Sequence, residues 1–85
     1  MAPILMYATA ICPFCVQAER LLRSRGVADI AKVRVDLEPA LRQEMMQKTG
    51  RRTVPQIYIG EVHVGGYDDL VALDRAGKLE PLLAA

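Results

Sequence analysis

The stretch Cys12-Pro13-Phe14-Cys15 decides the fold, because it joins a segment of strand character to one of helical character. The apolar run Pro3–Ala8 before it has the length of a buried strand. Residues 13–25 are predicted to form a helix, since Pro13 suits a first helical turn and Gly26 is a natural stop. The stripe of this helix expected to face the core consists of Cys15, Ala18 and Leu22.

Strand-like and helix-like segments continue to alternate beyond this junction. The order β-α-β-α-β-β-α begins with a βαβ unit, whose two strands run parallel through a right-handed crossover. A hairpin and a helix complete a four-stranded mixed sheet with helices on both faces, in a single α/β domain over residues 1–85. Further strands are expected over residues 30–37, 56–59 and 62–64, and further helices over 39–49 and 67–76, with a helical turn in 78–85.

Composition limits the kinds of protein that this chain can be. Its 85 residues are 52% hydrophobic and 25% charged, which suits a compact globule and not a disordered tail. A net charge of +1 without a basic stripe argues against a nucleic-acid partner. No apolar run reaches the ~18–20 residues of a membrane span, and the first residues lack the features of a secretion signal. The cytoplasm is therefore the default location, with a cleaved leader as the alternative. A monomer is expected because the sequence shows no obvious oligomer interface.

The cysteine pair is placed for chemistry more than for stability. A bridge between Cys12 and Cys15 closes so short a loop that it removes little entropy from the unfolded chain. At a helix N-terminus, free N–H groups and the helix dipole favour the Cys12 thiolate and lower the thiol pKa. We expect Cys12 to attack and Cys15 to resolve. A pair of small packed side chains, or half a zinc site completed by His63 and carboxylates, carries less weight.

Two cysteines at this spacing beside a βαβ pattern predict a thioredoxin-like fold. Three motifs together resemble the glutaredoxin family, and within it the small bacterial dithiol glutaredoxins. They are Cys12-Pro13-Phe14-Cys15, Thr53-Val54-Pro55 and Gly65-Gly66-Tyr67-Asp68-Asp69, and the resemblance covers essentially the whole chain. It implies an enzyme that uses glutathione as co-substrate, and no metal, to reduce protein disulfides and glutathione mixed disulfides.

The resemblance also implies where glutathione binds. Val54-Pro55 is similar to the family's cis-proline loop, whose backbone pairs with the cysteine residue of glutathione like an added strand. Gly66 allows close approach of a ligand, and the helix after it offers N–H groups to the γ-glutamyl carboxylate. Arg42 is expected to bind the glycyl carboxylate, with Arg51 and Arg52 as rivals. The binding residues implied are Thr9, Phe14, Arg42, Thr53, Val54, Pro55, Gly66, Tyr67 and Asp68.

Two residues depart from the family pattern. Thr9 stands where many members carry a lysine, so thiolate support is expected to rest more on helix N–H groups and on the Thr9 hydroxyl. A less acidic Cys12 or weaker glutathione binding follows. Phe14 replaces a more common tyrosine, and its ring either walls the groove without a hydroxyl or only packs locally. The other motifs also have purely structural interpretations. Pro55 could be an ordinary trans proline at the start of a strand, and Asp68-Asp69 could serve only to cap a helix.

Two other functions fit these residues less well. An iron–sulfur carrier would hold its cluster with Cys12 and glutathione across a dimer, but relatives that do so usually have Gly or Ser at the position of Pro13. A redoxin reduced by thioredoxin reductase needs no glutathione groove, and Arg42 and the Gly65–Asp69 motif argue for one. We interpret His63 as a surface residue and not as a base.

Overall fold

The computed structural model describes residues 1–85 and has the predicted order of strands and helices. The main difference lies in the second strand, which ends at Arg34, three residues earlier than expected. There the chain turns, and the Arg34 guanidinium holds the Asp36 carboxylate at 2.7 Å across the turn. The elements are β1 (Ile4–Ala8), α1 (Pro13–Ser24), β2 (Ala31–Arg34), α2 (Pro39–Thr49), β3 (Gln56–Ile59), β4 (Val62–Gly65), α3 (Tyr67–Arg75) and α4 (Leu79–Ala84).

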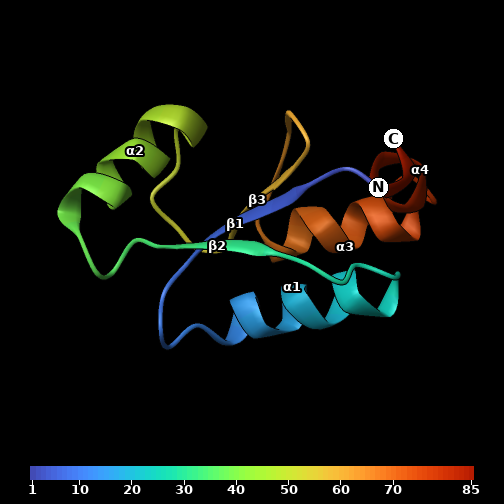
Figure 1. Ribbon diagram of the computed structural model, residues 1–85, viewed down its shortest axis with the longest axis horizontal. Helices are drawn as coiled ribbons and strands as arrows, with labels where there is room; N and C mark the ends of the chain where they lie inside the picture. Colours follow the sequence, from blue (N-terminus) through green and yellow to red (C-terminus); the bar gives the residue numbers. More distant parts are fainter.

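The sheet brings the three sequence motifs to one of its ends. Its strand order is β2-β1-β3-β4, with β1 parallel to β2 and the other pairs antiparallel. Tyr7 at the end of β1 lies opposite Gln56 at the start of β3, and Ile57 lies opposite Gly65 at the end of β4. The dithiol after β1, the proline loop before β3 and the double glycine after β4 therefore meet (Figure 1).

Apolar side chains fill both faces of the sheet. The larger core lies between the sheet and α1, α3 and α4, and a smaller one, built on Tyr7, Val35 and Met45, lies under α2. Figure 1 shows α1 below the strands, α3 to their right and α2 at the upper left. The predicted stripe of α1 is confirmed, since its members are at most 7% exposed, and burial of Leu22 stabilises the fold by roughly 1.5–3 kcal/mol. No helix has the length and apolar character needed to span a bilayer.

Candidate functional site

Cys12 lies at the N-cap of α1, where the chain is still extended, with φ −150° and ψ 91°. Its sulfur accepts a hydrogen bond from the Cys15 N–H at 3.2 Å. Pro13 occupies the first helical position, where an N–H would have no helical partner. An N–H group at the start of the helix therefore points at the Cys12 sulfur, and this favours negative charge on the sulfur.

The two cysteines form a disulfide and differ in exposure. Their Cα atoms are 5.2 Å apart, so this is the oxidised form of the pair. Cys12 is half-buried, whereas Cys15 lies in the core of α1 and is 7% exposed. Ile11, directly before the pair, is 90% exposed. An incoming sulfur therefore reaches Cys12 more readily than Cys15.

The second segment of the site is the loop that enters β3. The Val54–Pro55 peptide bond is cis, as the motif predicts. Pro55 is buried, Val54 is half-buried and Thr53 is exposed. The buried Gln56 side chain donates to the Thr53 carbonyl oxygen at 3.0 Å.

The third segment is the double glycine that leads from β4 into α3. Gly65 has φ +109°, and a Cβ there would fall on the Asp69 carboxylate and the Arg51 guanidinium. Asp69 accepts from the Gly66 N–H and from Arg51, both at 2.9 Å. The Arg51 hydrogen bond, followed by that of Gly66, holds the pKa of the Asp69 carboxyl below its usual value. The glycine therefore makes room for an ion pair that joins the proline loop to α3.

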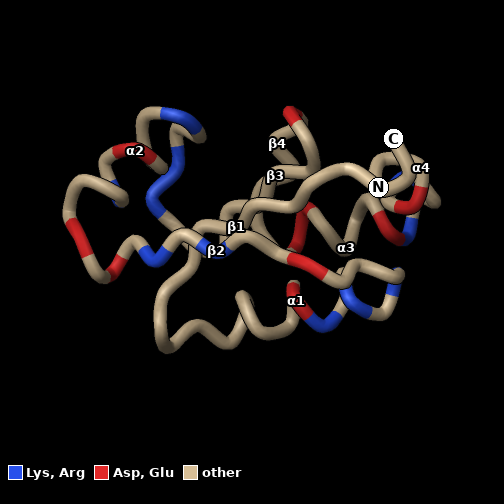
Figure 2. The backbone as a smooth tube through the Cα atoms, in the orientation of Figure 1, with Lys and Arg blue, Asp and Glu red and all other residues tan.

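These segments enclose a groove of about 340 Å³. The Phe14 and Tyr67 rings stack at one side of it, with centroids 6.1 Å apart and planes 27° from parallel. Cationic residues gather where α2 leads into β3 (Figure 2), and one of them, Arg51, lines the groove. The lining residues are Phe14, Arg51, Thr53, Val54, Pro55, Gly66, Tyr67, Asp68 and Asp69.

All of the residues predicted to bind glutathione line this groove except Thr9 and Arg42. Thr9 lies with both cysteines in a second hollow of about 220 Å³, which shares no lining residue with the groove. Its hydroxyl donates to the Ile11 carbonyl at 3.3 Å, and no hydrogen bond joins it to Cys12. The Arg42 guanidinium donates to the Arg52 carbonyl at 3.1 Å, in the chain leading to the proline loop.

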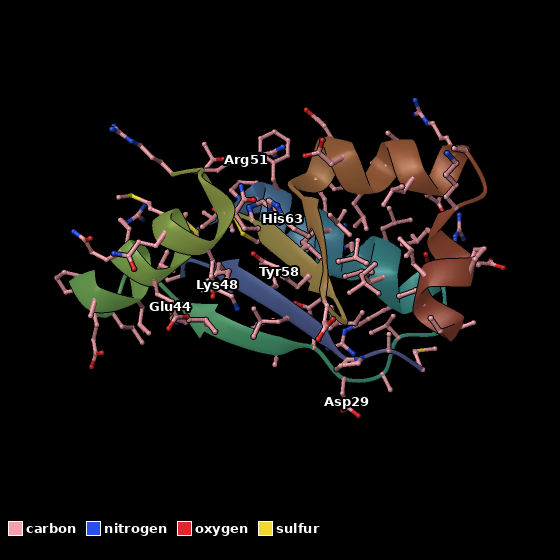
Figure 3. All side chains as sticks on the ribbon, turned by 90° about the horizontal axis from the view of Figure 1, so that it is seen from above. Asp29, Glu44, Lys48, Arg51, Tyr58 and His63 are labelled. Atoms are coloured by element: carbon pink, nitrogen blue, oxygen red, sulfur yellow. A yellow bond between two sulfur atoms is a disulfide. The ribbon has the colours of Figure 1, made fainter.

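Other residues reach the site without a clear sequence signal. Arg51 was expected only as a rival cation, and its pairing with Asp69 depends on the approach of two distant segments. His63, interpreted from sequence as a surface residue, is half-buried, because its ring stacks on Tyr58 and its Nε2 lies 2.8 Å from the Gln56 amide oxygen. Figure 3 shows His63 between Tyr58 and Arg51. Burial, and then the Arg51 charge, lower the pKa of His63.

Comparison with known proteins places the chain among close relatives. The family model for glutaredoxin matches residues 4–64. A glutaredoxin of Pseudomonas aeruginosa is 54% identical over 85 residues, which are 100% of both chains. Glutaredoxin 3 of Escherichia coli K12 is 47% identical over 83 residues, covering 98% of this chain and 99% of its own.

Solved structures agree with the sequence relatives. A buckwheat glutaredoxin–glutathione complex matches with a TM-score of 0.88 and 32% identity, over 98% of this chain and 77% of that one. The solution structure of a Brucella melitensis glutaredoxin matches with a TM-score of 0.84 and 46% identity, over 98% of this chain and 89% of that one. The predicted thioredoxin-like fold is confirmed.

Proposed function

Because this chain belongs to the glutaredoxin family of thiol–disulfide oxidoreductases, we propose that it reduces disulfides with electrons from glutathione, bound in the groove beside Cys12. The observation that carries the proposal is the position of Cys12 at the N-cap of α1, two residues before Phe14, which lines the groove. The comparisons favour this function over the cluster carrier and over a redoxin that depends on thioredoxin reductase.

Glutathione is proposed to lie along the groove with its sulfur towards Cys12. Its cysteine residue pairs with the Val54 backbone, like an added strand. The γ-glutamyl carboxylate meets the N–H groups at the start of α3, and Asp68 takes the ammonium. Arg51 also lies at this end, because its ion pair with Asp69 holds it beside α3. Arg42 stays the candidate for the glycyl carboxylate.

The first proposed reaction uses Cys12 alone. The Cys12 thiolate attacks the glutathione sulfur of a mixed disulfide, and the other thiol leaves and takes up a proton. Cys12 is then joined to glutathione. The thiolate of a second glutathione attacks the glutathione sulfur of this intermediate, which forms oxidised glutathione and frees the Cys12 thiolate. The Cys15 N–H and the N-terminus of α1 favour each anion that forms at Cys12.

The second proposed reaction uses both cysteines on protein disulfides. Cys12 attacks one sulfur of the target, and the other target sulfur leaves as a thiol. Cys15 then attacks the Cys12 sulfur and releases the second target thiol. The product is the Cys12–Cys15 disulfide, the form that the structure has. Two glutathione molecules reopen it in turn, and each supplies one electron of the pair.

The test is reduction of a mixed disulfide of glutathione and a small thiol, coupled to glutathione reductase and NADPH. Wild type is compared with Cys12→Ser and Cys15→Ser. We expect Cys12→Ser to abolish turnover and Cys15→Ser to keep it, because this substrate needs only the first reaction. A protein disulfide serves as the second substrate, and there Cys15→Ser is expected to lose turnover.

The proposal fails if wild type is inactive with glutathione and becomes active with thioredoxin reductase. Turnover by Cys12→Ser equal to that of wild type would instead overturn the role of Cys12. Folding of each variant is checked by circular dichroism, so that loss of turnover is not loss of structure.

A further inference from the structure

Gln56 is the one buried polar side chain, and its exposed fraction is 0%. The Gln56 amide nitrogen donates to the Thr53 carbonyl oxygen at 3.0 Å and lies 3.3 Å from the Thr53 hydroxyl. A carbonyl oxygen can only accept, so this contact fixes which end of the amide faces Thr53. The Gln56 amide oxygen must then face the other way, towards β4.

His63 provides the partner on that side. Its Nε2 lies 2.8 Å from the Gln56 amide oxygen, so the ring donates from Nε2. The His63 ring is held by stacking on Tyr58, with centroids 5.0 Å apart. Every buried polar side-chain atom has a partner. An unpaired buried amide costs free energy, so the hydrogen-bond network of His63, Gln56 and Thr53 has one favourable arrangement. In it His63 donates to Gln56, and Gln56 donates to Thr53.

Side chains, and not backbone pairing, hold the loop that this network reaches. Residues 51–55 take part in none of the backbone–backbone hydrogen bonds that lie outside helices and strands. The carbonyls of Arg52 and Thr53 are held instead by the side chains of Arg42 and Gln56. The next residue, Val54, is the one proposed to pair with glutathione. A loop held in this way depends on its side-chain anchors for its shape.

We propose that Gln56 is a positioning residue for glutathione, and that His63 orients its amide. This inference rests on the proposed function, because it concerns the Val54 backbone in the same groove. Without the network the loop is mobile, and ordering it on binding weakens affinity. The Cys12 sulfur lies on α1 and is not touched by the network. The effect therefore falls on the KM for the glutathione mixed disulfide more than on kcat.

The experiment compares four variants in the coupled assay. Gln56→Met keeps the length of the side chain and removes its polar atoms. His63→Phe keeps a ring on Tyr58 and removes the N–H donor, whereas His63→Gln restores a donor. Gln47→Met is the matched control, because Gln47 is exposed on α2. The NMR order parameter of the Val54 N–H, which reports the mobility of the loop, is measured on each protein without substrate.

Gln56→Met loses the hydrogen bonds to Thr53 and His63, and His63→Phe loses the bond between His63 and Gln56. Both are expected to raise KM about 5- to 30-fold, with kcat within about twofold. The order parameter at Val54 should fall from about 0.85, a rigid value, towards about 0.6. His63→Gln should lie nearer to wild type than His63→Phe, and Gln47→Met should match wild type. A KM and a Val54 order parameter unchanged in Gln56→Met would overturn the inference, even if the protein melts at a lower temperature. If wild type itself does not use glutathione, the proposed function fails, and the Val54 order parameters still decide whether Gln56 holds the loop.

Discussion

Replacing Gly65 with alanine tests whether this glycine shapes the groove or only relieves backbone strain. Its φ of +109° is a conformation that alanine adopts at a cost of roughly 1–2 kcal/mol. Gly26 offers a matched control, since its φ is +94° and an added Cβ there meets nothing within 4 Å. Both substitutions also change the unfolded chain in the same way. The difference between Gly65→Ala and Gly26→Ala therefore isolates what the Cβ displaces.

At Gly65 the Cβ displaces the Asp69 carboxylate. That carboxylate caps α3 through the Gly66 N–H, and loss of a cap costs about 0.5–2 kcal/mol. Its ion pair with Arg51 adds only a few tenths, because the two side chains are 44% and 48% exposed. We expect Gly26→Ala to lose about 1–2 kcal/mol of unfolding free energy and Gly65→Ala about 1 kcal/mol more. In a domain of this size that extra loss lowers Tm by about 4–8 °C.

Urea unfolding gives the stabilities, and the coupled glutathione assay gives KM. Gly65→Ala is expected to raise KM, because Asp69, Arg51 and the start of α3 all line the groove. Gly26→Ala should leave KM unchanged, since Gly26 follows α1 outside the groove. Equal stability losses and equal KM values in the two variants would refute the reasoning. Glycine would then be needed at position 65 only because of its positive φ.

Three further predictions follow from the charged and buried groups. The pKa of His63 is lowered in the folded protein, so the unfolded chain binds a proton at His63 more readily. Wild type should therefore lose stability as pH falls below about 6.5, through the folded pKa. His63→Gln should lose less stability between pH 7 and pH 5 in urea titrations, and an equal loss in the two proteins would contradict this prediction. Burial, and then the hydrogen bond to Glu44, raise the pKa of Tyr7 to about 12, so absorbance at ~295 nm should show a late ionisation that Tyr7→Phe removes. The stability that Tyr7 contributes is present below about pH 10 and is lost as pH rises towards 12. Arg51→Met should let the pKa of the Asp69 carboxyl rise towards its ordinary value in an NMR titration, and should raise KM about fivefold, from the loss of one charge-assisted contact; an unchanged Asp69 pKa would show that the pair does not persist in solution.

Local sequence signals predict much of this fold because they act through neighbouring residues. Pro13 and Gly26 bound a helix, and the apolar stripe between them can face only one way. The end of β2 was placed too late, since residues 30–37 keep the alternation of a strand beyond Arg34. What ends the strand is a turn closed by the Arg34–Asp36 pair, and a hydrophobic pattern does not show it.

The groove was predictable where one motif supplies its own geometry, and not where two distant segments meet. The proline loop and the double glycine carry their backbone shape in their residue types, and both line the groove. Arg42 was chosen over Arg51 by its position in the family pattern, yet only Arg51 lines the groove. Nothing near Arg51 in the sequence indicates Asp69, 18 residues later.

The absence of a lysine at Thr9 changes how charge is arranged around the dithiol. The Thr9 hydroxyl donates its hydrogen bond to the Ile11 carbonyl. The Cys15 N–H is therefore the one hydrogen-bond donor at the Cys12 sulfur. The cation that the groove does contain, Arg51, lies by α3 and pairs with Asp69. In the proposed glutathione complex, positive charge therefore lies at the γ-glutamyl end more than at the reacting sulfur. A lysine introduced as Thr9→Lys should then speed the attack by Cys12, measured as the rate of alkylation by iodoacetamide at pH 6, whereas Arg51→Met should leave that rate unchanged. Equal rates in wild type and Thr9→Lys would show that the helix-end N–H already supplies all of the support that the thiolate can use.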